Sequence, residues 1–569
     1  MRFVKQKLIL AVFIFGFLFF GLSNVFAKAE GEQETFFVEK SYDQKQRDFV
    51  TFRLVKVSDK AYFYIEGDWY LNITDQERGV INQNLAVLTN SFDKEIYPKL
   101  TALWGSEWTP GIDNDSKITI VFEQLTKGTA GYFNDGNEYL KQQSHFSNER
   151  EMIYLSTEIL KGGLAKSYLA HEFTHLILFN QKDRLQGVNE DIWLSEARAE
   201  YSPFYLGYDD QDKNSNLQQR INNFSKKPSD SLTIWNGEET DYGVVAIFTQ
   251  YLAEKYGEGI LSASIHSSKT GADSIDEALL KAGESKSFLQ IFNNWAIAVS
   301  LNDCSLGDVY CYKSSGLANL RLPTNLIVLP PAGKTNLSLN YSLMPWSSNW
   351  YRFIGSEGDL KLTFNFDAKA LFALKYVLCE IKDGCKVFDF NIANDQKQEL
   401  LIGNFSQKYL SLTLIPSVKP RFSNIAGLGD RYSFLVSVET TNDEPSQAHE
   451  EDVLIKSLLA QIEQLKAQIA KIQAQLAVSL PRPFACGGES GVVSLSTNLY
   501  FGLNSSAVSC LQEFLKQQGA DIYPQGIISG YFGSLTKTAV IKFQEKYGIS
   551  TTGYVGVLTR EKINQLLGL

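Results

Sequence analysis

The chain has 569 residues, of which 44% are hydrophobic, and its formal net charge at pH 7 is −10. A chain of this length exceeds the size of one compact core, so several domains are expected. The acidic balance argues against a nucleic-acid partner, because no surplus of Lys and Arg is present to neutralise phosphates.

The first residues have the pattern of a targeting segment. Three basic residues lie within the first seven, an apolar run of fifteen residues follows at 8–22, and Ala27 and Ala29 offer small side chains for cleavage. This order is typical of a secretory signal peptide, which we place at residues 1–27. An uncleaved membrane anchor is the alternative, but a spanning helix needs ~20 apolar residues. The sequence therefore predicts a secreted protein.

The six cysteines fall into three pairs of close neighbours, and none of the pairs has the C-x-x-C spacing of a zinc ribbon. In an oxidising compartment, cysteines that lie this close in sequence are expected to form local disulfides. The expected pairs are Cys304/Cys311, Cys379/Cys385 and Cys486/Cys510.

Residues 32–315 alternate strand-like and helix-like segments and then become mostly helical after about residue 165. Strands are predicted within 49–68, 116–125 and 150–157. A helix is predicted from Thr74, because the following apolar residues recur at helical spacing. We therefore predict an α+β domain whose second half is helical.

Residues 318–440 contain short β-rich runs separated by Gly, Asn, Asp and Pro. Their regular spacing predicts an antiparallel β-sandwich. No catalytic constellation is visible in it, so we interpret it as an accessory domain.

The segment 441–484 begins with a polar linker and continues as a heptad repeat. Ile and Leu alternate at spacings of three and four, a pattern that favours a parallel coiled-coil dimer. A single helical spacer, or a helix that packs on a neighbouring domain, is the alternative. The apolar positions are Ile455, Leu458, Ile462, Leu465, Ile469, Ile472 and Leu476.

Residues 485–569 resemble the peptidoglycan-binding-like domain, a small helical module of secreted bacterial wall enzymes. Ser505 stands where that family usually has a second glycine. The resemblance implies tethering to cell-wall glycan or peptide. The matching residues are Leu499, Gly502, Val508, Leu511, Gln512, Gly530, Phe532, Gly533, Thr536, Ala539, Val540, Phe543, Gln544, Gly548, Gly553, Val555, Gly556 and Thr559.

An H-E-x-x-H pattern is formed by His171, Glu172 and His175. Positions i and i+4 share one helical face, so both imidazoles can reach one Zn²⁺, which in catalytic sites takes a third protein ligand and one water. Glu196 follows His175 by twenty-one positions, and Glu200 lies one helical turn further. A second helix crossing the first would deliver Glu196 to the metal and Glu200 behind a ligand histidine. The alternative is a buried helix whose histidines are satisfied by other partners.

This spacing resembles that of the gluzincins, the thermolysin-like zinc peptidases. Upstream segments such as "AGYFNDGNEY" and "SNEREMIYL" are similar to the secreted hyicolysin-type metallopeptidases, over roughly residues 45–255. That family often reads W-L-N-E-G-x-A-E around the third ligand, whereas this chain has Ser195 and Ala197 at the Asn and Gly positions. The resemblance implies a thermolysin-like zinc peptidase domain at residues 32–315.

Zinc chemistry assigns roles to these residues. Glu172, beside the metal without ligating it, would take the proton of the attacking water and pass it to the leaving amine. Tyr242 and His266 are the two candidates for stabilising the oxyanion, although either also fits a packing or surface role. Asp113 and Asp115 could ligate Ca²⁺, but a turn with solvated carboxylates is the favoured interpretation.

The sequence therefore predicts a secreted, wall-associated zinc metalloendopeptidase that holds one Zn²⁺, acts on a protein or peptide substrate, binds peptidoglycan, and forms a homodimer if the heptads pair. One alternative is a peptidoglycan hydrolase that cuts peptide cross-links in the wall. The other is a non-catalytic wall-bound adhesin or scaffold, which the complete set of ligand residues disfavours.

Overall fold

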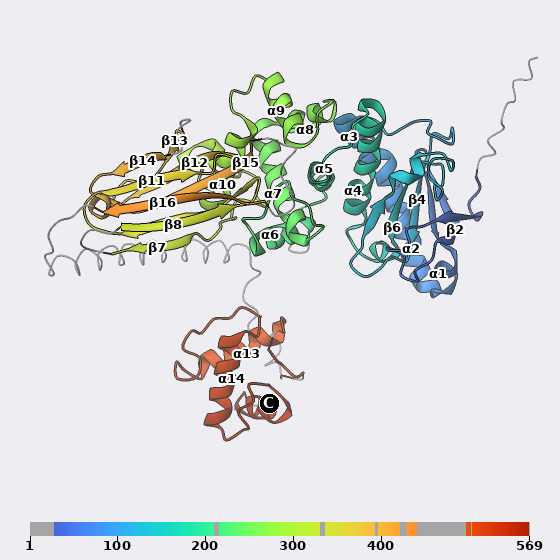
Figure 1. Cartoon of the computed structure of the whole chain (residues 1–569). Helices are drawn as coiled ribbons and strands as arrows, with labels where there is room; N and C mark the ends of the chain where they lie inside the picture. Colours follow the sequence, from blue (N-terminus) through green and yellow to red (C-terminus); the bar gives the residue numbers. More distant parts are fainter. Residues whose placement is uncertain are drawn as a thin grey trace, which may run out of the picture. The chain divides into compact units, whose positions relative to one another are not determined.

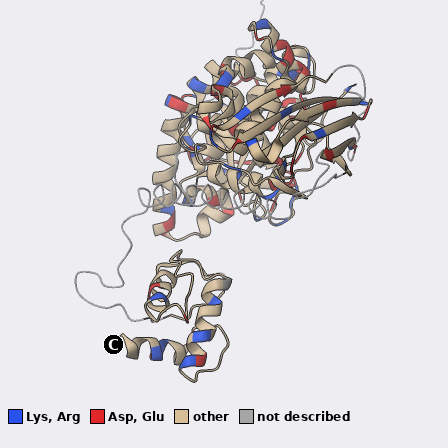
Figure 2. Ribbon diagram, turned by 90° about the vertical axis from the view of Figure 1, so that its left-hand side faces the viewer, with Lys and Arg blue, Asp and Glu red and all other residues tan. Residues whose placement is uncertain are grey.

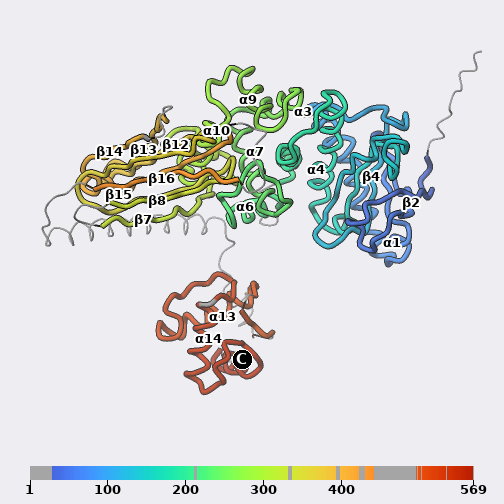
Figure 3. Tube along the Cα trace, viewed as in Figure 1, coloured from blue at the N-terminus to red at the C-terminus, as the bar shows by residue number. Residues whose placement is uncertain are grey.

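The computed structural model describes residues 28–209, 215–330, 336–392, 397–421, 430–440, 495, 497–501 and 503–567. The chain divides into two compact units, Met1–Ser457 and Leu458–Leu569. Figure 1 and Figure 3 follow the chain through them, and Figure 2 shows Lys and Arg interspersed with Asp and Glu along the ribbon. The predicted signal peptide and the predicted heptad helix lie outside the described residues.

The N-terminal part of the first unit is built on a six-stranded sheet of order β1-β2-β3-β4-β6-β5. β3, β4 and β6 are parallel, while β5 runs antiparallel to β6 at the sheet edge. The side chains alternate between the two faces, so Phe63 packs toward the helices and Tyr64 packs into a smaller cluster on the other face. The strands are β1 (Gln33–Phe37), β2 (Phe49–Val57), β3 (Ala61–Glu66), β4 (Ile118–Glu123), β5 (Gly131–Phe133) and β6 (Met152–Ser156).

Helices cover one face of this sheet and then continue as the helical second half that the sequence predicts (Figure 1). Thr74 caps the second helix in a capping box with Glu77, which satisfies two backbone N–H groups at its start. The helices are α1 (Gly67–Asn72), α2 (Asp75–Ser91), α3 (Tyr97–Trp104), α4 (Ala165–Leu178), α5 (Ile192–Tyr205), α6 (Asn216–Lys226), α7 (Glu239–Tyr256), α8 (Glu258–Ile265), α9 (Gly271–Lys281) and α10 (Phe288–Leu301). Short helical turns are η1 (Phe92–Ile96), η2 (Asp135–Glu138), η3 (Thr157–Lys161), η4 (Phe179–Arg184), η5 (Cys304–Leu306) and η6 (Asp308–Tyr310).

Two sheets with one hydrophobic core between them follow, as the sandwich prediction requires. Their strand orders are β13-β12-β15-β10-β7 and β14-β11-β16-β8. The expectation of a purely antiparallel arrangement is wrong, because β7 pairs with β10 in parallel. The elements are β7 (Asn325–Leu329), β8 (Asn336–Leu343), β9 (Ser347–Ser348), β10 (Tyr351–Gly355), β11 (Leu360–Phe366), β12 (Ala370–Glu380), β13 (Gly384–Phe390), β14 (Lys397–Ile402), α11 (Phe405–Lys408), β15 (Tyr409–Pro420) and β16 (Tyr432–Thr440).

The sandwich has its own core, but the core of the helical region crosses the boundary predicted between residues 315 and 318. The core of the helical region continues into the sandwich and includes Trp346, Trp350 and Ile415. The indole of Trp350 donates to the backbone oxygen of Ala296 in α10 at 2.7 Å, and Asn293 donates to the backbone oxygen of Ile415 at 2.8 Å. The sandwich therefore covers an apolar face of α10 and belongs to the same unit.

Two of the three predicted disulfides are present. Cys304 and Cys311 are bonded beside η6, and Cys379 and Cys385 join the neighbouring strands β12 and β13. Cys486 of the third predicted pair lies outside the described residues.

The second unit is a small helical domain with its own core. Ser505, which replaces the usual glycine, caps α13 by accepting a hydrogen bond from the backbone N–H of Val508, so the substitution suits the helix start. The buried amide of Gln512 accepts from the backbone N–H of Gly530, and Gln544 does the same for Gly553. The helices are α13 (Ser506–Gln517), α14 (Ser534–Lys546) and α15 (Val557–Leu566).

Candidate metal centre

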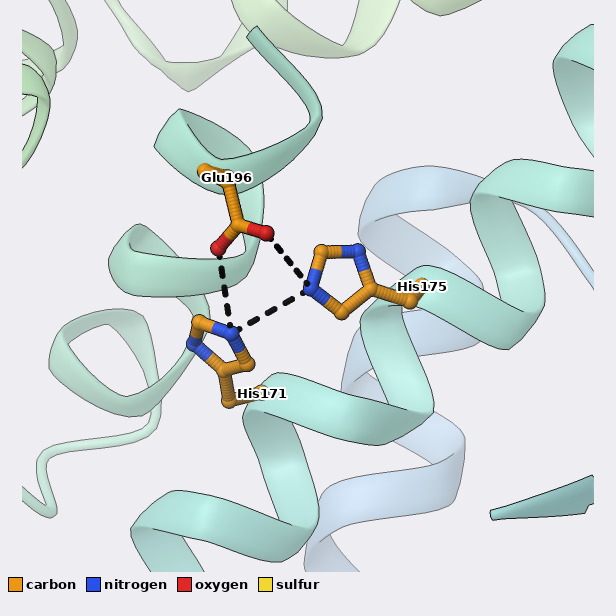
Figure 4. Close-up of side chains that lie close together, drawn as sticks. All are labelled: His171, His175 and Glu196. Atoms are coloured by element: carbon orange, nitrogen blue, oxygen red, sulfur yellow. Dashed lines mark hydrogen bonds and ion pairs between the residues drawn. The ribbon is translucent and has the colours of Figure 1, made fainter. Parts of the chain in front are cut away.

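Helix α4 places the two histidines of the H-E-x-x-H pattern on one face, and α5 crosses it with Glu196 (Figure 4). Ser202 on α5 fixes this crossing, because its buried hydroxyl lies 2.7 Å from that of Thr174 on α4 and accepts from the indole of Trp104 at 2.8 Å. The loop that leads into α5 is also held, because Glu190 pairs with Arg198 at 2.8 Å. The two helices therefore meet in a fixed register.

The ligand atoms of His171, His175 and Glu196 converge, all within 4.8 Å of one another. The two Nε2 atoms are 3.2 Å apart. The Glu196 carboxylate lies 3.4 Å from the Nε2 atom of His171 and 3.6 Å from the Nε2 atom of His175. Neighbouring ligand atoms of tetrahedral zinc are roughly 3.3–3.5 Å apart, given bond lengths of about 2.0–2.2 Å. The three separations match the edges of such a tetrahedron.

The chemistry of these donor atoms also fits a cation. The Oε2 atom of Glu196 is buried and accepts no hydrogen bond, and the two facing Nε2 atoms each carry a lone pair when the imidazoles are neutral. Burial lowers the pKa of His175 to about 4, which keeps this imidazole neutral. Burial raises the pKa of Glu196, but the facing histidines outweigh it, among them His171, whose pKa the surrounding carboxylates raise to about 9 despite its burial. The set is two imidazoles and one carboxylate, a set typical of catalytic zinc.

Glu200 lies behind His171, where the sequence predicts it. Its Oε1 atom is 3.4 Å from the Nδ1 atom of His171. Arg220 of α6 donates to both carboxylate oxygens at 2.6 and 2.7 Å, and Asn216 donates at 3.0 Å. Burial raises the pKa of Glu200, but the Arg220 guanidinium outweighs it and keeps the carboxyl ionised. Glu200 is thus an oriented acceptor for the ring N–H of His171.

Ser195 is the partner of the outer ring nitrogen of His175, as Glu200 is for His171. The sequence did not reveal this role. Its hydroxyl lies 3.2 Å from the Nδ1 atom of His175. Both histidines therefore have a partner on the ring nitrogen that faces away from the centre, which fixes their rings with Nε2 inward. The hydroxyl oxygen of Ser195 can accept a hydrogen bond from the ring N–H of His175 at this place.

Glu172 is buried between α4 and the edge strand β5. Burial raises the pKa of Glu172 to about 8, although His171 opposes the shift. A Cβ atom added to Gly131 of β5 would lie 2.9 Å from the Glu172 carboxylate and 2.8 Å from the backbone oxygen of Tyr154. Only a glycine lets this strand pass so close to the carboxyl group, a constraint that the sequence alone did not indicate.

A cavity of about 560 Å³ opens onto the centre and is lined by His171, Glu172, His175, Glu196 and β5. Its charged lining residues, all within the described part of the chain, are acidic or histidine. A second cavity of about 490 Å³ adjoins it and contains Glu200 and Arg220. The centre therefore lies in an accessible cleft.

Tyr242 lines both cavities, whereas His266 lines neither of them. Tyr242 packs edge-on against Trp235, and the Arg220 guanidinium lies 4.7 Å from its ring centre. His266 is an exposed residue at the C-terminal cap of α8, so its proposed role at the oxyanion has no geometric support. Of the two candidates, Tyr242 is the one that faces the site.

Asp113 and Asp115 form a turn, as the favoured interpretation holds. Asp113 accepts from the backbone N–H of Asp115 at 2.9 Å. Asp115 accepts from the hydroxyl of Tyr62 at 2.9 Å and from the backbone N–H of Lys117 at 3.1 Å. Among the described residues, no third metal-ligating side chain lies close enough to share a cation with Asp113 and Asp115.

Comparison with known families identifies the C-terminal unit. Residues 504–563 match the family described as "Putative peptidoglycan binding domain". No curated protein matches the chain. The chain thus carries a peptidoglycan-binding domain, which indicates association with the cell wall, and in the described residues no helix is both long and apolar enough to cross a membrane. The match does not reach His171, His175 and Glu196.

Replacement of Glu200 by Ala should weaken zinc binding by roughly 10–100-fold, the usual cost of losing a partner behind a metal ligand. The variant also leaves Arg220 buried without its carboxylate. Competition with a zinc-binding dye measures the affinity. Glu158→Gln, at an exposed carboxylate in η3, is the control and should bind zinc as the wild type does. Unchanged affinity in Glu200→Ala would show that His171 needs no such partner.

Proposed function

We propose that this protein is a cell-wall-associated zinc metalloendopeptidase of the gluzincin type. The observation that carries the proposal is the convergence of His171, His175 and Glu196 at tetrahedral spacing, with Glu172 beside them. Zinc bound there would polarise the scissile carbonyl and lower the pKa of water. The remaining chemistry belongs to side chains of the cleft.

Glu172 is the proposed general base. Its carboxylate lies on α4 between the two ligand histidines in sequence and faces the cleft, so it can accept a proton from water and later donate it to the leaving amine. Tyr242 is the proposed donor to the oxyanion, from the position where the two cavities meet.

The edge strand β5 is the proposed support for the substrate backbone. It is the last strand of its sheet, and Gly131, Tyr132 and Phe133 all line the cleft. One side of β5 pairs with β6, so the other side is left to hydrogen-bond an extended peptide as an added strand. A peptide held in this way would pass directly over Glu172, which favours an endopeptidase over an enzyme for small substrates.

The alternative of a peptidoglycan hydrolase is favoured by one observation, the wall-binding domain, which would hold the enzyme against peptide cross-links. A non-catalytic adhesin remains the third proposal. It would not explain why Glu200 lies beside the Nδ1 atom of His171 and Ser195 beside that of His175. These three functions differ in their products.

One experiment separates them: the full chain is incubated with an unfolded soluble protein and, in parallel, with purified sacculi. We expect fragments of the soluble protein, their loss after chelation, and recovery on adding zinc. Release of muropeptide fragments without protein cleavage would favour the hydrolase. No product from either substrate, with zinc bound, would contradict an enzymatic role.

A further inference from the structure

We propose that the buried carboxylates Glu138 and Glu151 bind a divalent cation, with calcium as its expected identity, at a second site behind the edge strand β5. The site is separate from the zinc centre. Glu138 ends the turn η2, and Glu151 directly precedes β6.

Glu138 is a buried carboxyl group that no N–H or hydroxyl group of the described residues satisfies. Only 3% of the residue is exposed, and neither of its carboxylate oxygens accepts a hydrogen bond from such a group. Such a group destabilises the folded state unless a proton or a cation neutralises it. The guanidinium of Arg184 does not do so directly, because it lies over the ring of Trp108 at 4.0 Å and donates to Asn180.

Glu151 brings a second carboxylate to the same place. It is 2% exposed and lies close enough to Glu138 for the two carboxyl groups to share a proton. The loop 111–115 closes over it: Ile112 donates its backbone N–H to Oε1 at 2.8 Å, and a Cβ atom on Gly111 would overlap Oε2. Gly111 has a φ of +85°, so this approach requires glycine. The loop thus wraps the carboxylate pair.

The charges around Glu138 and Glu151 also favour a bound cation. Burial raises the pKa of Glu138, and Glu151 and Asp113 raise it further, while Arg184 opposes them. Burial also raises the pKa of Glu151, with Asp113 acting in the same direction and the N–H of Ile112 in the opposite one. Three carboxylates therefore act on one another with no ion pair to Glu138 among the described residues, and a divalent cation would relieve the repulsion.

Calcium fits the available ligands better than zinc. The groups around the pair offer oxygen, and calcium takes six to eight oxygen ligands in flexible geometry, including water and carbonyl oxygens. Asp113 is exposed and acts electrostatically on both carboxyl groups, so it can add a ligand through water. The cavity of about 510 Å³ that Glu138 lines leaves room for coordinated water.

The site has a consequence for the cleft, because η2 follows β5 after a single residue. Phe179 and Asp183 line both the cavity at Glu138 and the cavity at the metal centre. A cation at Glu138 would therefore anchor the segment that positions the edge strand. Binding of calcium should stabilise the protein whether or not it is active.

The test uses the zinc-loaded full chain, freed of calcium by dialysis. CaCl₂ is titrated by calorimetry, and the thermal midpoint is recorded with zinc held constant. We expect about one Ca²⁺ per chain and a midpoint raised by roughly 2–5 °C at saturation. The rise should grow from pH 5 to pH 8, because carboxyls with a raised pKa hold protons at low pH that compete with the cation.

Glu138→Gln and Glu151→Gln should each abolish this response, whereas the exposed Glu158→Gln should retain it. Glu138→Gln also removes one of two repelling charges, so it should fold, with a calcium-free midpoint no lower than that of the wild type. No calcium binding by the wild type, or the same midpoint rise in Glu138→Gln, would overturn the proposal. Because these readouts need no substrate, they stand apart from the outcome of the peptidase assay.

Discussion

Glu172→Gln is expected to bind zinc with wild-type stoichiometry and to lose peptide hydrolysis by roughly 10²–10⁴-fold, the usual contribution of a general base. The amide keeps the size of the buried carboxyl group but cannot accept the proton of the water. The loss should appear in kcat, because the zinc ligands and the proposed peptide-binding strand β5 are unchanged in this variant. The same protein preparation gives the zinc content and the initial rate on an unfolded protein.

The fold control for this variant is its thermal midpoint. Glu172 is 6% exposed and its pKa is raised by burial, so the neutral amide should leave stability unchanged or slightly higher at pH 7. Glu158→Gln is the control for replacing a Glu by a Gln at an exposed position, and it should keep full activity. A rate within a few-fold of wild type for Glu172→Gln would mean that another group moves the proton, and the proposed mechanism would be abandoned.

The zinc ligand candidates could be predicted from sequence because their spacing is set by local geometry. His171 and His175 share a face through the helical repeat alone, and the same repeat places Glu200 one turn beyond Glu196. The one non-local step, the crossing of α4 and α5, depends on Thr174 and Ser202, which the sequence does not mark.

The partners around these ligands could not be predicted, since they arrive from remote segments. Arg220 comes from α6, and Gly131, in an edge strand, precedes the histidines by forty positions or more. Ser195 directly precedes the candidate ligand Glu196 in the sequence, where it was noted only because a Ser replaces the usual Asn. A lone Arg, Gly or Ser carries no pattern that reveals such contacts.

The packing across the predicted domain boundary could not be predicted for a related reason. A change from helical to strand periodicity marks where the secondary structure changes, near residue 318. It does not say which face of α10 is covered, and that face packs on the sandwich through Trp350 and Ile415. The parallel pairing of β7 with β10 was missed because strand partners are not local in sequence.

His175→Ala should reduce bound zinc from about one ion per chain to near zero at micromolar protein and abolish hydrolysis. Only His171 and Glu196 would remain as protein ligands, and catalytic zinc sites use three. Truncation also leaves the hydroxyl of Ser195 without its partner, a small loss in a side chain that is not fully buried. Elemental analysis after dialysis measures the zinc, and the soluble-protein assay measures the activity.

The matched control is His266→Ala, which removes an exposed imidazole outside the cleft. It should keep both zinc and activity, so any loss would restore His266 as a candidate at the oxyanion. The chelated wild type and His175→Ala should unfold at similar temperatures, because both lack the metal. Full zinc occupancy in His175→Ala would contradict the ligand assignment, and the convergence of His171, His175 and Glu196 would then be a buried polar contact between α4 and α5.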